Sequence, residues 1–178
     1  MDDLVLYEKE GAVGKVILNK PQHGNTLDLN TLHSLIGAFK QSDQNEDLCV
    51  LYTAVGKNFT FGADLKYGYE LQTKSGGLEE SVRYMASFQD LTRVMRKHRG
   101  ILIAGLKGLV IGGGFEISLS CDLRIAAKDT KIKFPELSIG TMFSNATTKL
   151  LPRIIGEGRT KELLLMARSI SAEVLITV

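Results

Sequence analysis

Residues 107–127 read KGLVIGGGFEISLSCDLRIAA, an apolar run followed by three glycines and an apolar stretch with one acid, Glu116. Glycine is favoured where φ must be positive or where a ligand approaches the backbone closely. A strand, a glycine turn and a helix in this order leave unpaired N–H groups at the start of the helix. The turn at Gly112, Gly113 and Gly114 therefore predicts a backbone site that attracts negative charge.

The glycine turn does not match the known phosphate motifs. A Walker A loop needs Gly-Lys-Ser/Thr where this chain has Phe115 and Glu116, and a dinucleotide loop needs a glycine at Ile117. An acid directly after the turn would also repel a phosphate. A carbonyl oxygen that becomes an oxyanion only during a reaction fits the turn better. The alternative, a tight strand–helix crossover with glycines for close packing, stays open on the turn alone.

A second isolated acid, Glu136, lies in FPELSIG at residues 134–140. Taken singly, Glu116 is an ordinary first-turn helix acid and Glu136 an ordinary loop acid, with Lys133 as its nearest candidate partner. Taken together, two acids in apolar stretches are typical of a general acid/base pair whose pKa values differ by environment. The pair thus predicts proton-transfer chemistry.

Composition indicates an ordinary globular protein, and we expect one domain over residues 1–178. Apolar residues make up 44% and charged residues 24%, and the net charge of +2 is too small for a nucleic-acid or membrane surface. No signal peptide and no apolar run long enough to span a bilayer are visible. We therefore expect a cytoplasmic protein that contacts neither nucleic acid nor membrane.

Cysteine and histidine contents argue against several other chemistries. Cys49 and Cys121 lie far apart in apolar surroundings, so both are expected to be reduced and buried. The three histidines lack metal-ligand spacing, and the sequence contains no GxSxG or HExxH motif. A two-carboxylate glycosidase is disfavoured because aromatic residues make up only 7% and tryptophan is absent. We expect no metal site.

Alternating strand and helix patterns predict an α/β chain. Asp28 is a candidate N-cap, residues 56–66 read as a loop, and the helix at 78–98 is expected to bury Val82 and Met85. The expected strands cover residues 4–7, 13–18, 48–55, 101–108, 122–127 and 132–134. The expected helices cover residues 28–39, 78–98, 147–155 and 160–166, with a short one from the glycines to about residue 120.

Five ordered motifs then resemble the crotonase superfamily, the enoyl-CoA hydratase/isomerase family. They are NKPQHGNTLDL (19–29), FTFGADLK (59–66), KGLVIGGGFEISLSCDLRIAA (107–127), FPELSIG (134–140), and LLPRIIG (150–156) with KELLLMARSISAE (161–173). The resemblance runs from about residue 13 to residue 173. It implies a spiral of ββα repeats, a homotrimer or hexamer, and no cofactor beyond the coenzyme A of the substrate.

The resemblance also implies a catalytic site for hydration of an enoyl-CoA thioester. The backbone N–H groups of Ala63 and Gly113 would form an oxyanion hole for the thioester carbonyl. Glu116 would activate water, and Glu136 would deliver a proton to the α-carbon. Family isomerases usually keep only the second acid, so the presence of both favours hydration.

The same resemblance implies residues that contact the acyl-CoA. Asp64 is expected to hold its loop, and Lys66 is either a surface charge or a phosphate contact. The expected contacts are Gln22, His23, Gly24, Phe61, Gly62, Asp64, Leu65, Lys66, Gly112 and Gly114.

The sequence departs from the family pattern in two places. Residues 143–148 read FSNATT where hydratases typically have PGAGGTQ. Ser144 or Asn145 is therefore expected to hydrogen-bond either a polar acyl group or the catalytic water. The alternative is that one of them caps the N-terminus of the following helix. The chain ends at SAEVLITV, where family members continue into further helices. We therefore expect a C-terminally truncated spiral.

These departures keep alternatives open. Hydration is the leading interpretation, and the altered 143–148 segment leaves isomerase, acyl-CoA hydrolase or decarboxylase chemistry as the alternative within the enzyme class. The missing C-terminal helices favour an inactive protein that binds acyl thioesters. The acyl group and the carrier, coenzyme A or acyl carrier protein, stay undetermined.

Overall fold

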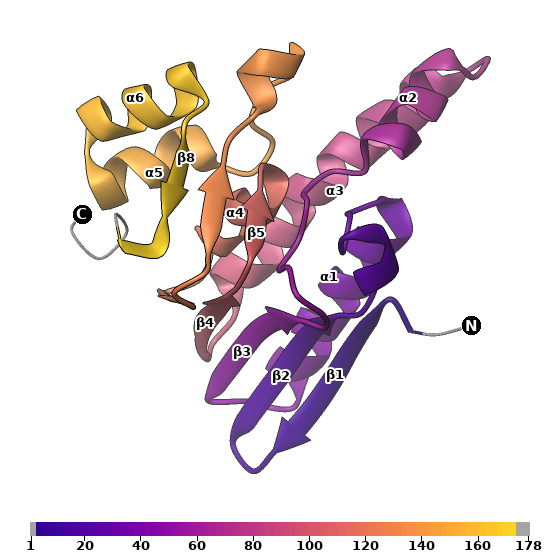
Figure 1. Ribbon diagram of the computed structural model, residues 1–178. Helices are drawn as coiled ribbons and strands as arrows, with labels where there is room; N and C mark the ends of the chain where they lie inside the picture. The colour runs from indigo at the N-terminus through magenta and orange to yellow at the C-terminus, as the bar shows by residue number, and fades with distance from the viewer. Residues whose placement is uncertain (1–2, 174–178) are drawn as a thin grey trace.

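The computed structural model describes residues 3–173, which fold into two sheets and their covering helices (Figure 1). The larger sheet has five strands in the order β1-β2-β3-β4-β6. Its strands are β1 (Val5–Glu10), β2 (Val13–Leu18), β3 (Cys49–Ala54), β4 (Ile101–Leu106) and β6 (Leu123–Ala126). Only β1 runs antiparallel to its neighbour, and the other three pairs are parallel.

The smaller sheet has the order β5-β7-β8. It contains β5 (Leu109–Ile111), β7 (Lys131–Lys133) and β8 (Ser169–Ser171). Isolated parallel bridges between Leu27 and Ala63 and between Thr60 and Val110 continue its pattern toward the N-terminus. Successive turns of the chain thus place a strand in the larger sheet and a strand or bridge in the smaller one. This confirms the predicted spiral.

The helices follow the strands of each turn. They are η1 (Pro21–His23), α1 (Leu29–Gln44), α2 (Leu65–Thr73), α3 (Gly77–Lys97), α4 (Gly113–Ser118), η2 (Glu136–Ile139), α5 (Thr147–Ile155) and α6 (Glu157–Met166), where η marks a 3₁₀ helix. The side chain of Asp28 accepts a hydrogen bond from the N–H of Thr31, so the predicted N-cap of α1 is confirmed. A cap of this kind stabilises a helix by about 1 kcal/mol.

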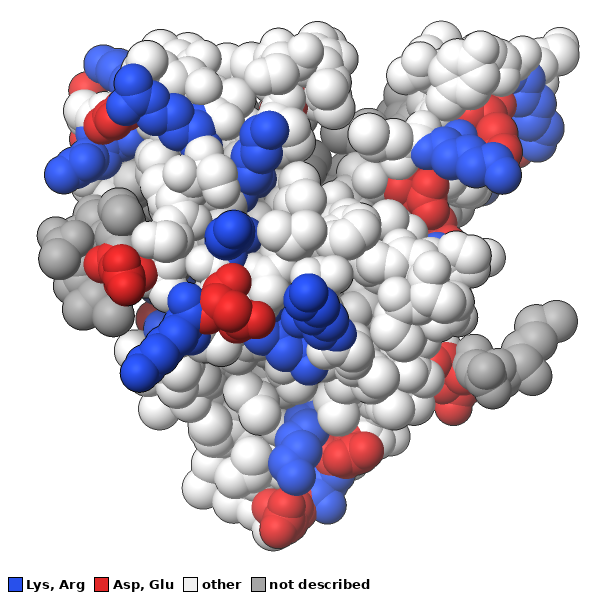
Figure 2. Space-filling view, in the orientation of Figure 1, with Lys and Arg blue, Asp and Glu red and all other residues white. Residues whose placement is uncertain are grey.

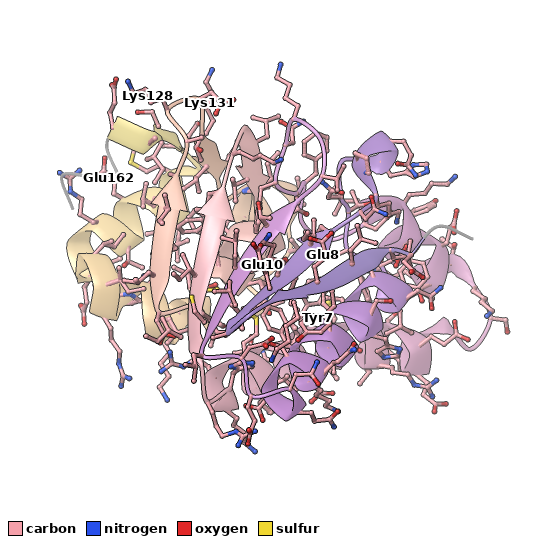
Figure 3. The ribbon with its side chains drawn as sticks, turned by 90° about the horizontal axis from the view of Figure 1, so that it is seen from below. Tyr7, Glu8, Glu10, Lys128, Lys131 and Glu162 are labelled. Atoms are coloured by element: carbon pink, nitrogen blue, oxygen red, sulfur yellow. The ribbon has the colours of Figure 1, made fainter. Side chains whose placement is uncertain are left out.

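The core lies between the sheet and the helices. α1 and α3 pack against each other on one side of the larger sheet (Figure 1). The fully buried Tyr52 of β3 makes edge-on ring contacts with Phe39 of α1 and with Phe59, with centroid distances of 5.6 and 5.1 Å. Seen from below, β1 with Tyr7 and Glu8 forms one edge of this sheet, and α6 with Glu162 lies toward the other (Figure 3).

Several sequence predictions were wrong in detail. The loop prediction at residues 56–66 missed that α2 begins at Leu65, and the short strands β5 and β8 were not predicted. Val82 and Met85 are exposed, because α3 turns Tyr84 rather than these residues toward α2. Cys121 is buried as expected, but Cys49 is only half-buried. Residues 174–178, on which the expectation about the chain end rests, lie outside the described residues.

The surface carries charges of both signs. On the face shown in Figure 2, basic and acidic side chains are interspersed rather than gathered into one field. No described helix combines the length and the apolar character that crossing a membrane requires.

Candidate active site

The glycine turn connects β5 to α4 and brings Glu136 against the backbone. Gly112 has φ 51° and ψ −125°, a conformation that favours glycine, and its N–H donates to the carbonyl of Lys133 at 2.9 Å. A Cβ atom at Gly112 would lie 2.4 Å from Oε1 of Glu136. Glycine is therefore required at this position so that the Glu136 carboxyl group can lie against the turn.

The loop that carries Ala63 lies directly against the glycine turn. A Cβ atom at Gly62, where φ is 81°, would lie 2.5 Å from the carbonyl oxygen of Ile111 and 3.1 Å from the nitrogen of Gly113. A Cβ atom at Gly113 would in turn lie 3.7 Å from the nitrogen of Ala63. The structure thus brings together the two backbone segments that the sequence separates by about 50 residues.

The N–H groups of Ala63 and Gly113 have no hydrogen-bond acceptor within residues 3–173. The neighbours of Ala63 are both bonded: Gly62 donates to Oγ1 of Thr60 at 3.0 Å, and Asp64 donates to the carbonyl of Leu27 at 3.1 Å. Gly113 is the first residue of α4, where no intrahelical acceptor exists. Two free backbone donors, on Ala63 and Gly113, therefore lie close together.

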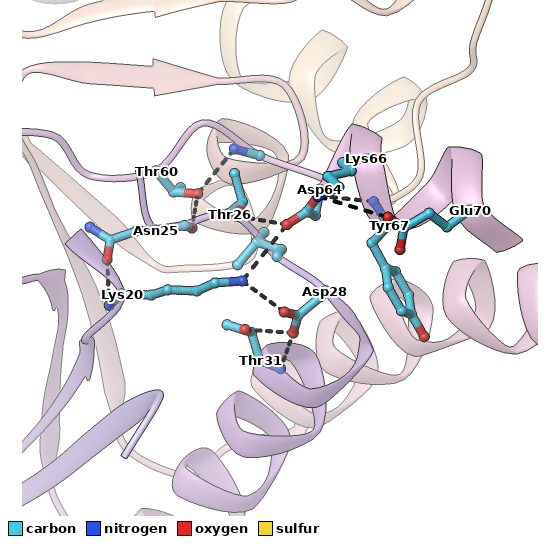
Figure 4. A network of polar contacts seen from close by, with 12 residues as sticks. Lys20, Asn25, Thr26, Asp28, Thr31, Thr60, Asp64, Lys66, Tyr67 and Glu70 are labelled. Carbon is cyan, nitrogen blue, oxygen red and sulfur yellow. Dashed lines mark hydrogen bonds and ion pairs between the residues drawn. The ribbon is translucent and has the colours of Figure 1, made fainter. Parts of the chain in front are cut away.

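A half-buried ion pair supports the Ala63 loop (Figure 4). Nζ of Lys20 lies 2.7 Å from Oδ2 of Asp28 and 3.7 Å from Oδ2 of Asp64, which also accepts from Thr26 at 3.0 Å. Asp64 caps α2 by accepting from the N–H of Tyr67 at 3.0 Å, which agrees with the expectation that it holds its loop. The Lys20 contacts tie the loop after β2 to the loop after β3.

Asn25 and Thr60 form a second tie that the sequence did not reveal (Figure 4). Asn25 is buried, and its side-chain amide donates to the carbonyls of Val55 and Asn58, both at 3.1 Å. Oγ1 of Thr60 donates to the carbonyl of Asn25 at 2.6 Å and accepts from Gly62. The sequence offered only one signal, the polar Asn25 in a breaker-rich loop. Such a residue is equally compatible with buried hydrogen bonds between two loops and with an exposed turn.

Glu116 is 1% exposed and is held by one of its two oxygens. Oε2 accepts from Oγ1 of Thr147 at 2.7 Å and from the N–H groups of Ser144 and Asn145 at 2.9 and 3.0 Å. Burial raises the pKa of Glu116, and the three donors oppose that rise because they stabilise the ionised form.

Glu136 has the opposite environment. Its Oε2 atom is buried and contacts no hydrogen-bond partner in the part of the chain that the structure describes. Burial, reinforced by the nearby Glu116 carboxylate, raises the pKa of Glu136 from 4.5 to about 7. Near neutral pH, Glu116 is therefore the acid that is better suited to be ionised, and Glu136 the one better suited to carry a proton.

The expected acyl-CoA contacts differ in how the structure places them. A Cβ atom at Gly24 would lie 2.4 Å from the ring of Phe61, so these two residues are in contact. A Cβ atom at Gly114 would lie 2.2 Å from Cγ2 of Thr60, so Gly114 permits close packing of the two loops. Leu65 and Lys66 begin α2 with exposed side chains, and Lys66 lies 3.9 Å from Glu70. Gln22 and His23 are exposed in η1.

The expectation for Ser144 and Asn145 was wrong as regards capping. The N-cap of α5 is Ala146, with φ 31°, and no side chain bonds to the start of the helix. Ser144 and Asn145 instead use their backbone N–H groups to hold Glu116. Backbone donors in a loop leave no mark on the sequence.

A cavity of about 640 Å³ lies between β6, α5, α6 and β8, and neither Glu116 nor Glu136 lines it. Within residues 3–173, no group of three or more His, Cys, Asp or Glu side chains could hold a metal ion. The cluster of Ala63, Gly113, Glu116 and Glu136 is thus the candidate active site.

The two-sheet spiral, with free N–H groups beside a buried acid pair, defines an α/β protein of the crotonase type. Residues 8–177 match the family described as enoyl-CoA hydratase/isomerase, and the chain belongs to this family.

Named relatives and solved structures agree with this assignment. The chain is 32% identical over 173 residues to the short-chain-enoyl-CoA hydratase of Clostridium acetobutylicum. It is 30% identical over 171 residues to the crotonyl-CoA hydratase of Syntrophomonas wolfei. Each match covers 95% of this chain and 64% of the relative, so the chain spans less than two thirds of either protein's length. The structure of an enoyl-CoA hydratase from Thermoplasma volcanium superimposes with a TM-score of 0.90 at 28% identity, covering 99% of this chain and 69% of that one.

Proposed function

We propose that this protein hydrates the 2,3 double bond of an enoyl-CoA thioester. The observation that carries the proposal is the pairing of two free backbone donors, on Ala63 and Gly113, with two buried carboxyl groups whose environments differ. The donors suit a thioester carbonyl on which negative charge develops. The acids suit a reaction that needs one base and one acid at the same time.

Each group has one task in the proposed reaction. Glu116 takes a proton from water as the water oxygen bonds to the β-carbon. The electron pair of the double bond shifts toward the thioester carbonyl, and the N–H groups of Ala63 and Gly113 stabilise the resulting oxyanion. Glu136 then gives its proton to the α-carbon, which yields a 3-hydroxyacyl thioester. Proton exchange with solvent restores both acids.

The donors contribute enough to justify the glycine turn. Removing one oxyanion-hole donor typically raises the barrier by about 3 kcal/mol. A glycine in a helix costs roughly 1 kcal/mol relative to alanine. The gain in transition-state stabilisation therefore exceeds the loss of conformational stability.

An assay with crotonyl-CoA tests the proposal directly. Hydration removes the absorbance of the conjugated thioester and gives 3-hydroxybutyryl-CoA, which chromatography identifies. A product with a shifted double bond would identify an isomerase, and free coenzyme A a hydrolase. Binding of crotonyl-CoA without any product would support the inactive acyl-thioester-binding protein instead.

The activity is expected to fall as pH rises through about 7. Glu136 must carry a proton to act as the acid, and its pKa is raised to about 7 by burial and by Glu116. At acid pH the rate falls again as Glu116 becomes protonated, because a protonated carboxyl group cannot take a proton from water. A profile of kcat against pH from 5 to 9 checks this, and a rate that stays constant from pH 6 to 9 would contradict the assignment of Glu136.

We propose that the protein forms a cytoplasmic homotrimer or hexamer. Large apolar side chains on α2 and α3 are exposed on the arm that projects from the two sheets in Figure 1: Leu65, Tyr69, Leu78, Val82 and Met85. Exposed apolar groups of this kind are typical of interfaces. Light scattering after size exclusion is expected to give three or six times 19.5 kDa, whereas a stable monomer at micromolar concentration would contradict the assembly.

A further inference from the structure

Thr147 holds the proposed base through a side chain rather than through the backbone. It is 1% exposed at the first position of α5, and its Oγ1 atom lies 2.7 Å from Oε2 of Glu116. Oγ1 also lies 3.0 Å from the carbonyl oxygen of Asn145. A hydroxyl has one proton, so the ionised carboxylate, which is closer and charged, takes that hydrogen bond.

The segment that carries these donors is itself fixed to α3. Oγ1 of Thr92 donates to Oδ1 of Asn145 at 3.1 Å, and the side-chain amide of Gln89 donates to the carbonyl of Ser144. The side-chain amide of Asn145 donates to Oγ of Ser144 at 3.1 Å. These contacts hold residues 144–147 in place, so the direction of the donors does not depend on a flexible loop.

All three hydrogen bonds to Glu116 end on the same oxygen, Oε2. No N–H or hydroxyl donor of residues 3–173 contacts its other oxygen, Oε1, and the carboxyl group of Glu136 lies within hydrogen-bonding reach of the Glu116 carboxyl group. A carboxylate that is anchored by one oxygen keeps its orientation and its charge, while the second oxygen has no N–H or hydroxyl donor and faces the side where Glu136 and a water molecule can meet it. The anchor is therefore suited to a base that must meet its water in one geometry.

We propose that Thr147 is a positioning residue that holds the Glu116 carboxylate in the orientation in which it can take a proton from the attacking water. This role rests on the proposed hydration. Thr147 lies in the 143–148 segment, where the sequence departs from the glycine-rich motif of the family. The Thr147 hydroxyl thus gives Glu116 a side-chain hydrogen-bond donor, and a glycine has no side chain that could supply one.

One ionisable side chain among the described residues acts on Glu116. Glu136, on η2, is the ionisable group that faces it among the described residues. The other groups that act on Glu116 are the uncharged donors of residues 144, 145 and 147. Loss of the hydroxyl should therefore change the titration of Glu116 without removing a charge from the site.

The test compares Thr147→Val, which removes the hydroxyl at constant shape, with Thr147→Ser, which keeps it. Carbon-13 NMR of glutamate-labelled protein reports the titration of Glu116, which is assigned by its absence in Glu116→Gln. A hydrogen bond to a charged group is worth about 1.5–3 kcal/mol. We therefore expect Thr147→Val to move the midpoint upward by about one to two pH units and to lower kcat by roughly 10- to 100-fold.

Thr148→Val serves as the matched control, because Thr148 is exposed one position further along α5. We expect its midpoint and kcat to equal those of the wild type, and Thr147→Ser to restore both. An unchanged midpoint in folded Thr147→Val would overturn the proposal, because a purely structural residue would alter the melting temperature alone. The NMR result is independent of turnover: a raised midpoint in a protein that does not hydrate crotonyl-CoA would support the positioning role and refute the proposed function.

Discussion

Replacing Glu136 by glutamine is expected to lower kcat for crotonyl-CoA hydration by roughly 10²- to 10⁴-fold, the usual contribution of a general acid. Glutamine keeps the shape of the side chain but has no proton to give to the α-carbon. Binding of crotonyl-CoA, measured by calorimetry, should change little because the N–H donors stay in place. Glu8→Gln is the control, since Glu8 is exposed on the edge strand β1 (Figure 3). Near-full turnover in Glu136→Gln would remove Glu136 from the mechanism.

The same variant should become more stable than the wild type at alkaline pH. The folded-state pKa of Glu136, about 7, lies above its ordinary value of 4.5, so the folded protein binds more protons between these limits. Stability is therefore lost as pH rises from about 4.5 to 7, by up to about 3 kcal/mol. Glutamine removes this loss. Urea unfolding at pH 5 and pH 8 checks the sign, and it also shows that lost activity does not reflect misfolding.

Replacing Gly62 by alanine is expected to lower kcat by roughly 10²- to 10³-fold, the usual effect of losing an oxyanion-hole donor. Gly62 has φ 81°, and the added Cβ atom would lie 2.5 Å from the backbone carbonyl of Ile111. Backbone cannot yield as a flexible side chain would, so the two loops must separate. That movement takes the N–H of Ala63 away from the N–H of Gly113.

Gly37→Ala is the control for this substitution. Gly37 is an exposed residue within α1, and no atom lies within 4 Å of the position that its Cβ would take. We expect kcat to be unchanged and the stability to rise by about 1 kcal/mol, because alanine favours a helix interior. Full activity of Gly62→Ala, with circular dichroism like that of the wild type, would show that the contact of the two loops is not needed for catalysis.

Local signals in the sequence were enough to predict most of the fold. The N-cap at Asp28 and the buried strand that contains Tyr52 follow from short-range patterns of apolar and capping residues. α2 escaped prediction because its residues are mostly exposed and its only capping signal, Asp64, lay in a segment with the features of a loop. Val82 and Met85 matched a helix face, but packing against α1 and α2 decides which face of α3 is buried.

The site could be predicted only in part. The two glutamates and the glycine turn carry side-chain or glycine signals that the sequence displays. The donors to Glu116 from Ser144 and Asn145 are backbone groups, and their direction depends on the contact between residues 144–147 and α3. The Lys20–Asp28–Asp64 tie likewise joins two loops that only the spiral brings together.

The central claim is that Glu116 activates the water that adds to the enoyl thioester. The most direct measurement is a single-turnover reaction of crotonyl-CoA with excess protein, for the wild type and for Glu116→Gln, with binding measured on the same samples. We expect the wild type to convert the bound thioester to 3-hydroxybutyryl-CoA, and Glu116→Gln to bind it with comparable affinity and leave it unconverted. Conversion by Glu116→Gln at the wild-type rate, or no conversion by folded wild-type protein that binds crotonyl-CoA, would contradict the account.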